Sequence, residues 1–287
     1  MTSIPAPRRL NRLAPLAILG LLAAVFVSPA PVAAADALTL SQAEQAMVNA
    51  LNADRTVRGL VPVRIDTRLM AIARARSYDM ASKHYFSHTQ PDGRNVFKIL
   101  TSKGIKWYTA GEIIATNNYP TLQNSVDSAN YQWMHSPGHK AIVVSTSMNY
   151  VGVGLAIDAS NGKKLWTAVY IKGPDRTGAK ATAAKPVVSA GTTSATKRVT
   201  VSWTGADVRL QVLTSGFHTF RVQRRVDGGA WTTVTWGTTV KAMTFLVATN
   251  HTYEFRVGAR DKAGNWGAWS TATASTVPTV GAVAASR

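Results

Sequence analysis

The sequence predicts an α+β domain followed by a second domain that is all β. In the first half of the chain, apolar residues recur at helical spacing, and two apolar strands then follow that are joined across Asn161-Gly162, a dipeptide typical of hairpin turns. In the second half, short segments alternate between apolar and polar residues, and Asp227-Gly228-Gly229 provides a turn between two of them. The 287 residues are enough for two domains of ordinary size.

Residues 1–35 are predicted to be a signal peptide rather than part of either domain. Arginines at positions 8, 9 and 12 precede an apolar run over residues 13–27, and alanines at positions 33 to 35 offer a small-residue cleavage site. A retained membrane anchor is the alternative, because the apolar run reaches the lower length limit of a transmembrane helix. Prolines, a glycine and the alanine cluster favour cleavage, so we expect an extracellular, secreted protein.

The charge and the cysteine count restrict the chemistry of the protein. The chain has no cysteine, which excludes disulfides, a lipoprotein anchor and thiolate catalysis. Its formal net charge of +18 favours polyanionic partners, and we expect an anionic cell-wall polymer or a lipid surface. Simple solubility with non-specific adhesion is the alternative. No nucleic-acid module is recognisable, so no specific nucleic acid is expected, and the protein is expected to be a monomer.

Capping residues delimit the first two helices of the α+β domain. Ser41 lies three residues before Glu44, which is the capping-box pattern, and Gly59 can act as the C-terminal cap. Asp66 can cap the second helix, which runs towards His84.

The later elements of this domain place the residues that could carry chemistry. A third, short helix ends at Gly104, the GEIIA segment that follows places Glu112 on a strand or extended loop, and Pro120 starts a fourth helix. That helix should break at Ser136, because a residue before proline avoids the helical region. Ser136 can then cap a new turn that carries His139.

Ordered motifs in this domain resemble a known family. The order FSHT, PDG, GEIIA and WMHSPGHK, followed by VGVGLAI, resembles the bacterial branch of the CAP superfamily, also called SCP, over residues 40–172. The resemblance implies a three-layer α-β-α sandwich. It also implies a shared cleft with His88, Glu112, His139 and Ser136 at its motif positions.

The donor types at these positions suggest a metal site. Two imidazoles, from His88 and His139, and the carboxylate of Glu112 would leave an open fourth position on zinc, and the resemblance implies metal binding in this cleft. The eukaryotic-type cleft of the superfamily has a second glutamate where this chain has Ser136, so the full four-residue cleft is incomplete. The alternative for both histidines is a structural hydrogen bond at a helix terminus. No cofactor other than zinc is expected.

Enzymatic alternatives find less support in the sequence. His84 and His88 are spaced like a metalloprotease pair, but no glutamate follows His84. Ser87 and Ser136 lie near histidines, yet no G-x-S-x-G elbow is present. Aromatic residues could line a groove for a small apolar ligand, as the superfamily suggests, or could belong to the core; they are Trp107, Tyr108, Tyr119, Tyr131 and Trp133.

The second half of the chain resembles a different domain type. Residues 173–198 are rich in Gly, Ala, Thr, Ser and Lys without periodicity, as expected of a flexible linker. Residues 185–278 resemble a fibronectin type III domain, in which Trp203 would be the buried tryptophan and Tyr253 the corner tyrosine.

Together these features favour a secreted bacterial CAP-domain binding protein. Its His/Glu cleft would take a divalent metal or an apolar ligand, and its C-terminal module would dock it on a surface or polymer. The alternative is a zinc-dependent extracellular hydrolase that uses the same cleft.

Overall fold

The computed structural model describes residue 2 and residues 38–276. The signal peptide predicted for residues 1–35 therefore lies outside the described residues, apart from Thr2. Within the described part of the chain, no helix is long and apolar enough to cross a membrane.

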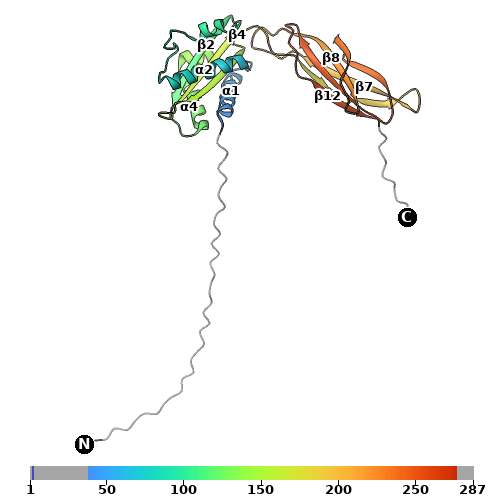
Figure 1. The fold of residues 1–287 in the computed structure, drawn as a ribbon, viewed down its shortest axis with the longest axis horizontal. Coiled ribbons are helices and arrows are strands. Elements are labelled where there is room, and N and C mark those ends of the chain that lie inside the picture. The colour runs from blue at the N-terminus through green and yellow to red at the C-terminus, as the bar shows by residue number, and fades with distance from the viewer. Residues whose placement is uncertain (1, 3–37, 277–287) are drawn as a thin grey trace. The chain divides into compact units, whose positions relative to one another are not determined.

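The first domain is a four-stranded sheet with helices on both faces (Figure 1). The strand order is β1-β3-β4-β2, in which β1 runs parallel to β3 and the other pairs are antiparallel. Nearly every residue of β3 and β4 is buried, as expected of central strands covered on both faces. The elements in chain order are α1 (Leu40–Thr56), β1 (Arg64–Ile65), α2 (Thr67–Ser82), α3 (Val96–Ser102), β2 (Thr109–Asn117), α4 (Leu122–His135), α5 (Pro137–Val143), β3 (Tyr150–Ile157) and β4 (Lys164–Lys172).

Apolar residues from different helices fill the two sides of this sheet. On one side, Met47 of α1 and Trp133 of α4 are fully buried in a cluster with Val153 of β3. On the other side, Leu69 of α2 and Leu100 of α3 are buried in a second cluster. The helical spacing read from the sequence therefore corresponds to the faces that these helices bury.

Some predicted helix starts are displaced in the structure. The capping box of α1 is formed by Thr39 and Gln42, rather than by Ser41 and Glu44. Glu44 is instead buried, and its carboxylate accepts hydrogen bonds from Arg74 and from the backbone of the central strand β3. A carboxylate that faces the sheet is not free to cap its own helix.

The start of α4 differs in the same way, but its end is as expected. This helix begins at Leu122 with Thr121 as its N-cap, not at Pro120. It ends at His135, and Ser136 separates it from α5. Ser136 is the N-cap residue of α5 by position, but its side chain makes no capping hydrogen bond.

Two glycines of β3 let α2 pack directly on the sheet. A Cβ atom added at Gly152 would lie 2.1 Å from the carbonyl carbon of Leu69, and one added at Gly154 would lie 2.2 Å from that of Ala73. No real Cβ atom tolerates such distances, so both positions require glycine. The close packing positions α2, which carries the charged residue at the centre of the candidate site.

The second domain contains two antiparallel sheets (Figure 1). One has the order β10-β7-β5 with β6 also paired to β7, and the other has the order β12-β11-β8-β9. Buried residues from both sheets, among them Trp203, Phe220 and Phe255, share one core. The strands are β5 (Lys180–Ala183), β6 (Val187–Ala190), β7 (Thr196–Ala206), β8 (Phe217–Val226), β9 (Thr232–Thr238), β10 (Ala242–Ala248), β11 (Thr252–Asp261) and β12 (Ser270–Ser275).

Residues 173–198 differ from the flexible linker expected for them. This segment contains β5, β6 and the start of β7, and both short strands pair with β7. In β5 the buried residue is Ala181, which alternates with the polar Lys180 and Thr182. Because alanine is small, this alternation gives only a weak apolar pattern in the sequence.

The loop between β7 and β8 packs on the first domain. Leu210 is 2% exposed and belongs to the same apolar cluster as Leu69 and Tyr150. The side chain of Gln211 accepts a hydrogen bond from the backbone N–H of Val61 at 2.8 Å. These contacts join the domains through a loop that the sequence did not single out.

Candidate functional site

The centre of the candidate site is a buried pair between α2 and β2. Arg76 of α2 donates from Nε to Oε1 of Glu112 at 2.9 Å, and the two side chains are 1% and 3% exposed. Burial disfavours the charge on Arg76, but its hydrogen bond and its attraction to Glu112 outweigh this and raise its pKa. The guanidinium of Arg76 is therefore held in its charged form beside Glu112.

Glu112 also fixes a histidine at the surface. Its Oε2 lies 2.8 Å from Nδ1 of His88, whose side chain is 52% exposed. The carboxylate thus uses one oxygen for Arg76 and the other for His88. Because Glu112 accepts from Nδ1, the Nε2 atom of the His88 ring carries no proton in the neutral form.

Arg76 also organises the segment that carries His88. Its remaining nitrogens donate to the hydroxyl of Tyr85 and to the backbone carbonyl of Ser87, each at 2.8 Å. The Tyr85 hydroxyl in turn donates to Asp79, which also accepts from Gln90 at 2.9 Å. One guanidinium therefore holds both the carboxylate and the loop that bears the histidine.

His139 lies near this group. It occupies the first turn of α5, and its pKa is lowered by burial and, to a smaller degree, by the charge of His88. Near His88, Glu112 and Ile142 the surface forms a cavity of about 270 Å³. The structure thus brings the predicted residues His88, Glu112 and His139 into one region between β2, α5 and the loop after α2.

The three residues are not arranged as a closed set of metal ligands. Among the described residues 38–276, His88, Glu112 and His139 do not form a group whose ligand atoms all lie within 4.8 Å of one another. Ser136 is half-buried at the junction of α4 and α5 and supplies no carboxylate. The donor types fit a metal, but Glu112 is already engaged on both oxygens.

His84 and His135 have structural roles. The His84 backbone has a positive φ of 54°, and its Nδ1 lies 2.8 Å from Asp158 in the β3–β4 turn. His135 stacks on Tyr131 with ring centroids 3.7 Å apart and bonds to its backbone carbonyl. Both imidazoles therefore have partners other than Glu112.

The aromatic residues considered for a groove are divided between core and surface. Trp133 is fully buried, and Trp107 packs against the cluster beneath α3. Tyr108, Tyr119 and Tyr131 are 62%, 48% and 63% exposed. A pocket of about 360 Å³ instead lies along α2 and α3, with Ile72, Ile99 and Ile105 in its wall and with basic side chains from Arg68, Arg76 and Lys103.

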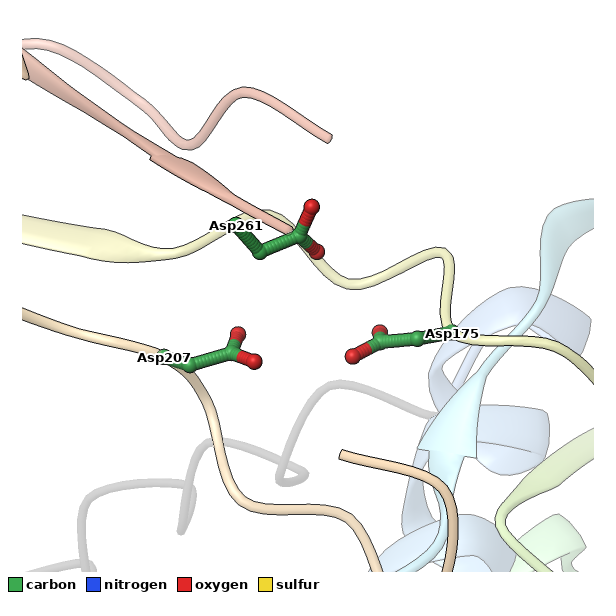
Figure 2. Close-up of side chains that lie close together, drawn as sticks. All are labelled: Asp175, Asp207 and Asp261. Carbon is green, nitrogen blue, oxygen red and sulfur yellow. The ribbon is translucent and has the colours of Figure 1, made fainter. Parts of the chain in front are cut away.

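Three aspartates form a cluster that the sequence did not reveal. Asp175, Asp207 and Asp261 offer ligand atoms that all lie within 4.8 Å of one another, and Figure 2 shows the three side chains close together. They come from three separate loops or strand ends, so no local spacing could have indicated them. Each already accepts hydrogen bonds from nearby groups, among them Ser215 and Asn265.

Comparisons of sequence agree with the motif order. Residues 48–170 match the model of the cysteine-rich secretory protein family, CAP. The uncharacterized protein YkwD of Bacillus subtilis is 35% identical over 133 residues, which are 46% of this chain and 48% of that protein. The chain therefore spans about half the length of this curated relative. Both matches fall in the first half of the chain and support a CAP, or SCP, domain of the bacterial type there.

Several solved structures have low similarity to part of this chain. An extracellular protein of Bacillus anthracis that contains an SCP domain is 24% identical with a TM-score of 0.40, over 47% of this chain and 44% of that one. A cysteine-rich secretory protein of Staphylococcus aureus is 16% identical with a TM-score of 0.37, over 47% and 39% of the two chains. An outer surface protein of Borrelia burgdorferi is 17% identical with a TM-score of 0.42, over 48% and 97%.

Proposed function

We propose that the protein is a secreted binding protein, whose CAP domain presents a His/Glu cleft and whose second domain docks it on an anionic surface. The main observation in support of a ligand-binding cleft is the 2.8 Å contact between His88 Nδ1 and the buried Glu112. It fixes the imidazole through one nitrogen and leaves the other nitrogen of a half-exposed ring for a ligand.

Zinc is the ion that these donors suit best. A carboxylate bonded to the far nitrogen of a metal-binding histidine orients the ring and raises its basicity. Glu112 suits that supporting position better than a ligand position, because its two oxygens already hold Arg76 and His88. His88 and His139 would then bind the ion, and the positions left open on it would take water or a bound molecule.

The hydrogen bonds that Glu112 accepts on both oxygens favour a binding protein over a hydrolase. A general base must be free to accept a proton from the attacking water, but both oxygens of Glu112 are occupied by donors. The position of a second carboxylate is Ser136, which cannot replace it. We therefore place the zinc-dependent hydrolase second and expect no turnover of peptides or esters.

Calorimetric titration of zinc into the secreted protein tests the cleft. His88→Ala and His139→Ala should each weaken zinc binding at least about tenfold, and Glu112→Gln about tenfold through loss of its support. His84→Ala is the matched control, because this histidine bonds to Asp158 in a different turn. Wild-type affinity should fall below roughly pH 6 as the imidazoles protonate.

Two results of this titration would change the proposal. Zinc binding that survives all three substitutions would remove the metal from the cleft. Zinc-dependent turnover that disappears in Glu112→Gln would favour the hydrolase.

The pocket along α2 and α3 is the place where we expect a small apolar ligand. Its wall contains isoleucines, and the Oε1 atom of Gln90 is buried there without a hydrogen-bond donor among the described residues. A ligand with an apolar body and one donor group would suit this lining. Ile99→Glu, at a half-buried position of this wall, should abolish the uptake of a fluorescent fatty alcohol and leave zinc affinity unchanged.

We infer that the second domain is a fibronectin type III-like sandwich. Trp203 is 2% exposed in the core that the two sheets share. The hydroxyl of Tyr253 donates to the carbonyl of Ala248, a few residues upstream, as a corner tyrosine does. Tyr253→Phe should lower the free energy of unfolding by about 1 kcal/mol, as expected for one lost hydrogen bond.

Export and docking have their own tests. N-terminal sequencing of secreted material should give a start at or near Asp36.

Positive charge on the protein supports binding to an anionic wall polymer or lipid surface, because lysines and arginines outnumber acidic residues. Sedimentation with isolated bacterial cell walls should therefore show binding that weakens with salt.

A further inference from the structure

Arginine and tryptophan side chains alternate over one sheet of the second domain. Trp269 contacts two guanidiniums, those of Arg221 at 4.0 Å and Arg256 at 4.5 Å from its ring centroid. Trp231 lies close to Arg256 at 4.3 Å and to Arg225 at 4.7 Å. We call the whole set the Arg–Trp stack, formed by Arg221, Arg225, Arg256, Arg260, Trp231, Trp236, Trp266 and Trp269.

The strand register places this set on the outer face of the sheet. Along β8, Phe220 and Val222 are buried in the core, so Arg221 and Arg225 point to the other face. The same alternation in β11 puts Arg256 opposite Gln223 of β8. The face is therefore the solvent side of β12-β11-β8-β9.

A glycine makes room for the stack. Gly258 lies opposite Arg221 across the two strands, and a Cβ atom there would lie 2.9 Å from Nε of Arg221. The missing side chain lets the guanidinium lie close to the sheet and contact Trp269. The stack is thus built into the backbone pairing and is not a chance meeting of long side chains.

The positive charge on this face is only partly neutralised. Arg225 pairs with Glu254. Among the described residues, Arg221, Arg256 and Arg260 make no ion pair, and Arg256 bonds to the neutral side chain of Gln223. The pKa of Arg221 is lowered by burial and by the nearby charge of Arg256, which agrees with cations held side by side. Three fixed guanidiniums therefore remain for an external anion.

One aromatic ring beside these charges is open to solvent. Trp231, Trp266 and Trp269 each contact two guanidiniums. Trp236 contacts only Arg221, at 5.5 Å, and is 59% exposed. It lies 5.2 Å from Trp266, which contacts both Arg221 and Arg260. An open indole next to unpaired arginines offers one ring platform within reach of anion-binding groups.

We propose that the Arg–Trp stack is a binding site for an acidic polysaccharide, in which a sugar ring packs on Trp236 and carboxylates of the polymer bind Arg260 and Arg221. This inference rests on the docking role proposed above for the second domain and names its surface and its partner. Guanidiniums bind carboxylates with two parallel hydrogen bonds, and those held in a stack lose little freedom on binding. Charge complementarity thus favours an anionic polymer. The single exposed indole, that of Trp236, favours a polymer whose sugar rings can pack on it.

Other polyanions match this surface less well. A single strand of nucleic acid binds through successive bases on successive open aromatic rings. Here each of the other three indoles already contacts two guanidiniums, so a track of open platforms is missing within the described face. A lipid surface needs apolar side chains that enter it, whereas the exposed group here is a lone indole.

Calorimetric titration of the secreted protein with polygalacturonate tests the proposal. Trp236→Ala should weaken binding about fivefold, and Arg260→Gln by a similar factor. The matched controls lie on the other sheet: Leu246→Ala removes an exposed apolar side chain from β10, and Arg198→Gln removes an exposed charge from β7. Both controls should bind as the wild type does, and circular dichroism should show that all four variants are folded.

Two outcomes would overturn the proposal. One is that Arg198→Gln weakens binding as much as Arg260→Gln, since diffuse charge would then explain the affinity. Another is that neutral dextran, oligothymidylate or anionic phospholipid vesicles bind more tightly than polygalacturonate.

Sedimentation with cell walls separates this inference from the docking role. If Trp236→Ala and Arg260→Gln bind walls as the wild type does, docking stands and the Arg–Trp stack is not its surface. If the wild-type protein does not bind cell walls, but Trp236→Ala weakens the binding of polygalacturonate, the site stands and the docking role fails.

Discussion

The Nε atom of Arg76 lies 2.9 Å from Oε1 of Glu112, and both side chains are almost completely buried. Placing two charges in a protein interior is costly, so a pair of this kind adds little net stability compared with an apolar pair. Removal of one partner is different, because it leaves the other charge buried and alone. The pair is therefore a sensitive point for both folding and the cleft.

Arg76→Ala should lower the free energy of unfolding by about 3–5 kcal/mol, the range for a broken buried ion pair. Urea denaturation followed by circular dichroism measures this loss. Arg58→Ala is the control, because Arg58 pairs with Asp54 at the surface, where such pairs contribute less than about 1 kcal/mol. A loss for Arg76→Ala as small as that of the control would show that Glu112 is solvated in the folded protein.

Asp79 should make the protein sensitive to acid. Burial would raise the pKa of Asp79, but hydrogen bonds from Lys83, Tyr85 and Gln90 outweigh it and lower the pKa to about 2. The pKa of an aspartate in an unfolded chain is about 3.9. At pH values between the two pKa values, the folded state therefore binds fewer protons than the unfolded chain. The stabilisation is therefore complete above about pH 4 and is lost as the pH falls towards 2.

Comparison of wild type with Asp79→Asn measures this contribution. The difference in urea midpoint between the two proteins should be largest above about pH 4 and should shrink as the pH approaches 2. Asp127→Asn serves as the control, because Asp127 is exposed on α4 and accepts its hydrogen bond from the neutral side chain of Gln123. A difference that stays constant over this range would mean that Asp79 titrates normally.

Much of the first domain could be predicted from its sequence, because its elements have local causes. The N-cap role of Asp66 and the break of α4 before Pro137 depend on neighbours in the chain, and the structure confirms both. The capping box expected at Ser41 and Glu44 overlaps with a second candidate, Thr39 and Gln42. The second one forms, because the side chain of Glu44 faces the core and that of Gln42 does not. Local pattern places a helix well but does not decide such a competition.

The partners within the site could not be predicted in the same way. The sequence pointed to His88, Glu112 and His139, but not to Arg76, which lies 36 residues from Glu112 and looks like one more arginine of an amphipathic helix. The Arg–Trp stack was also invisible, since it requires the register of β8 against β11. Contacts that depend on tertiary pairing leave little trace in local composition.

Gly152→Ala should destabilise the first domain severely. The new Cβ atom would lie within about 2 Å of the backbone of α2, so the helix must move off the sheet. Overpacking of a core by one methyl group commonly costs about 1–3 kcal/mol, and a clash with backbone belongs at or above the upper end. The thermal midpoint of unfolding measures the effect. Gly138→Ala is the control, since nothing lies near its added methyl group; equal midpoints for the two variants would contradict the close packing of α2 on β3.

His139 should titrate below the ordinary range of histidine, and His88 should contribute to this shift. Burial is the larger cause of the lowered pKa, and the charge of His88 is the smaller one. In His88→Ala the pKa of His139 should therefore rise, yet stay below about 6.5 because the burial remains. Because the folded state binds fewer protons than the unfolded chain, His139 should also cause stability to fall as the pH drops below about 6.5. NMR titration of the Hε1 resonance of His139 measures the shift, with His84→Ala as a control that leaves it unchanged. A His139 pKa that does not respond to His88→Ala would show that the two imidazoles do not interact, and the proposed pair of zinc ligands would then be wrong.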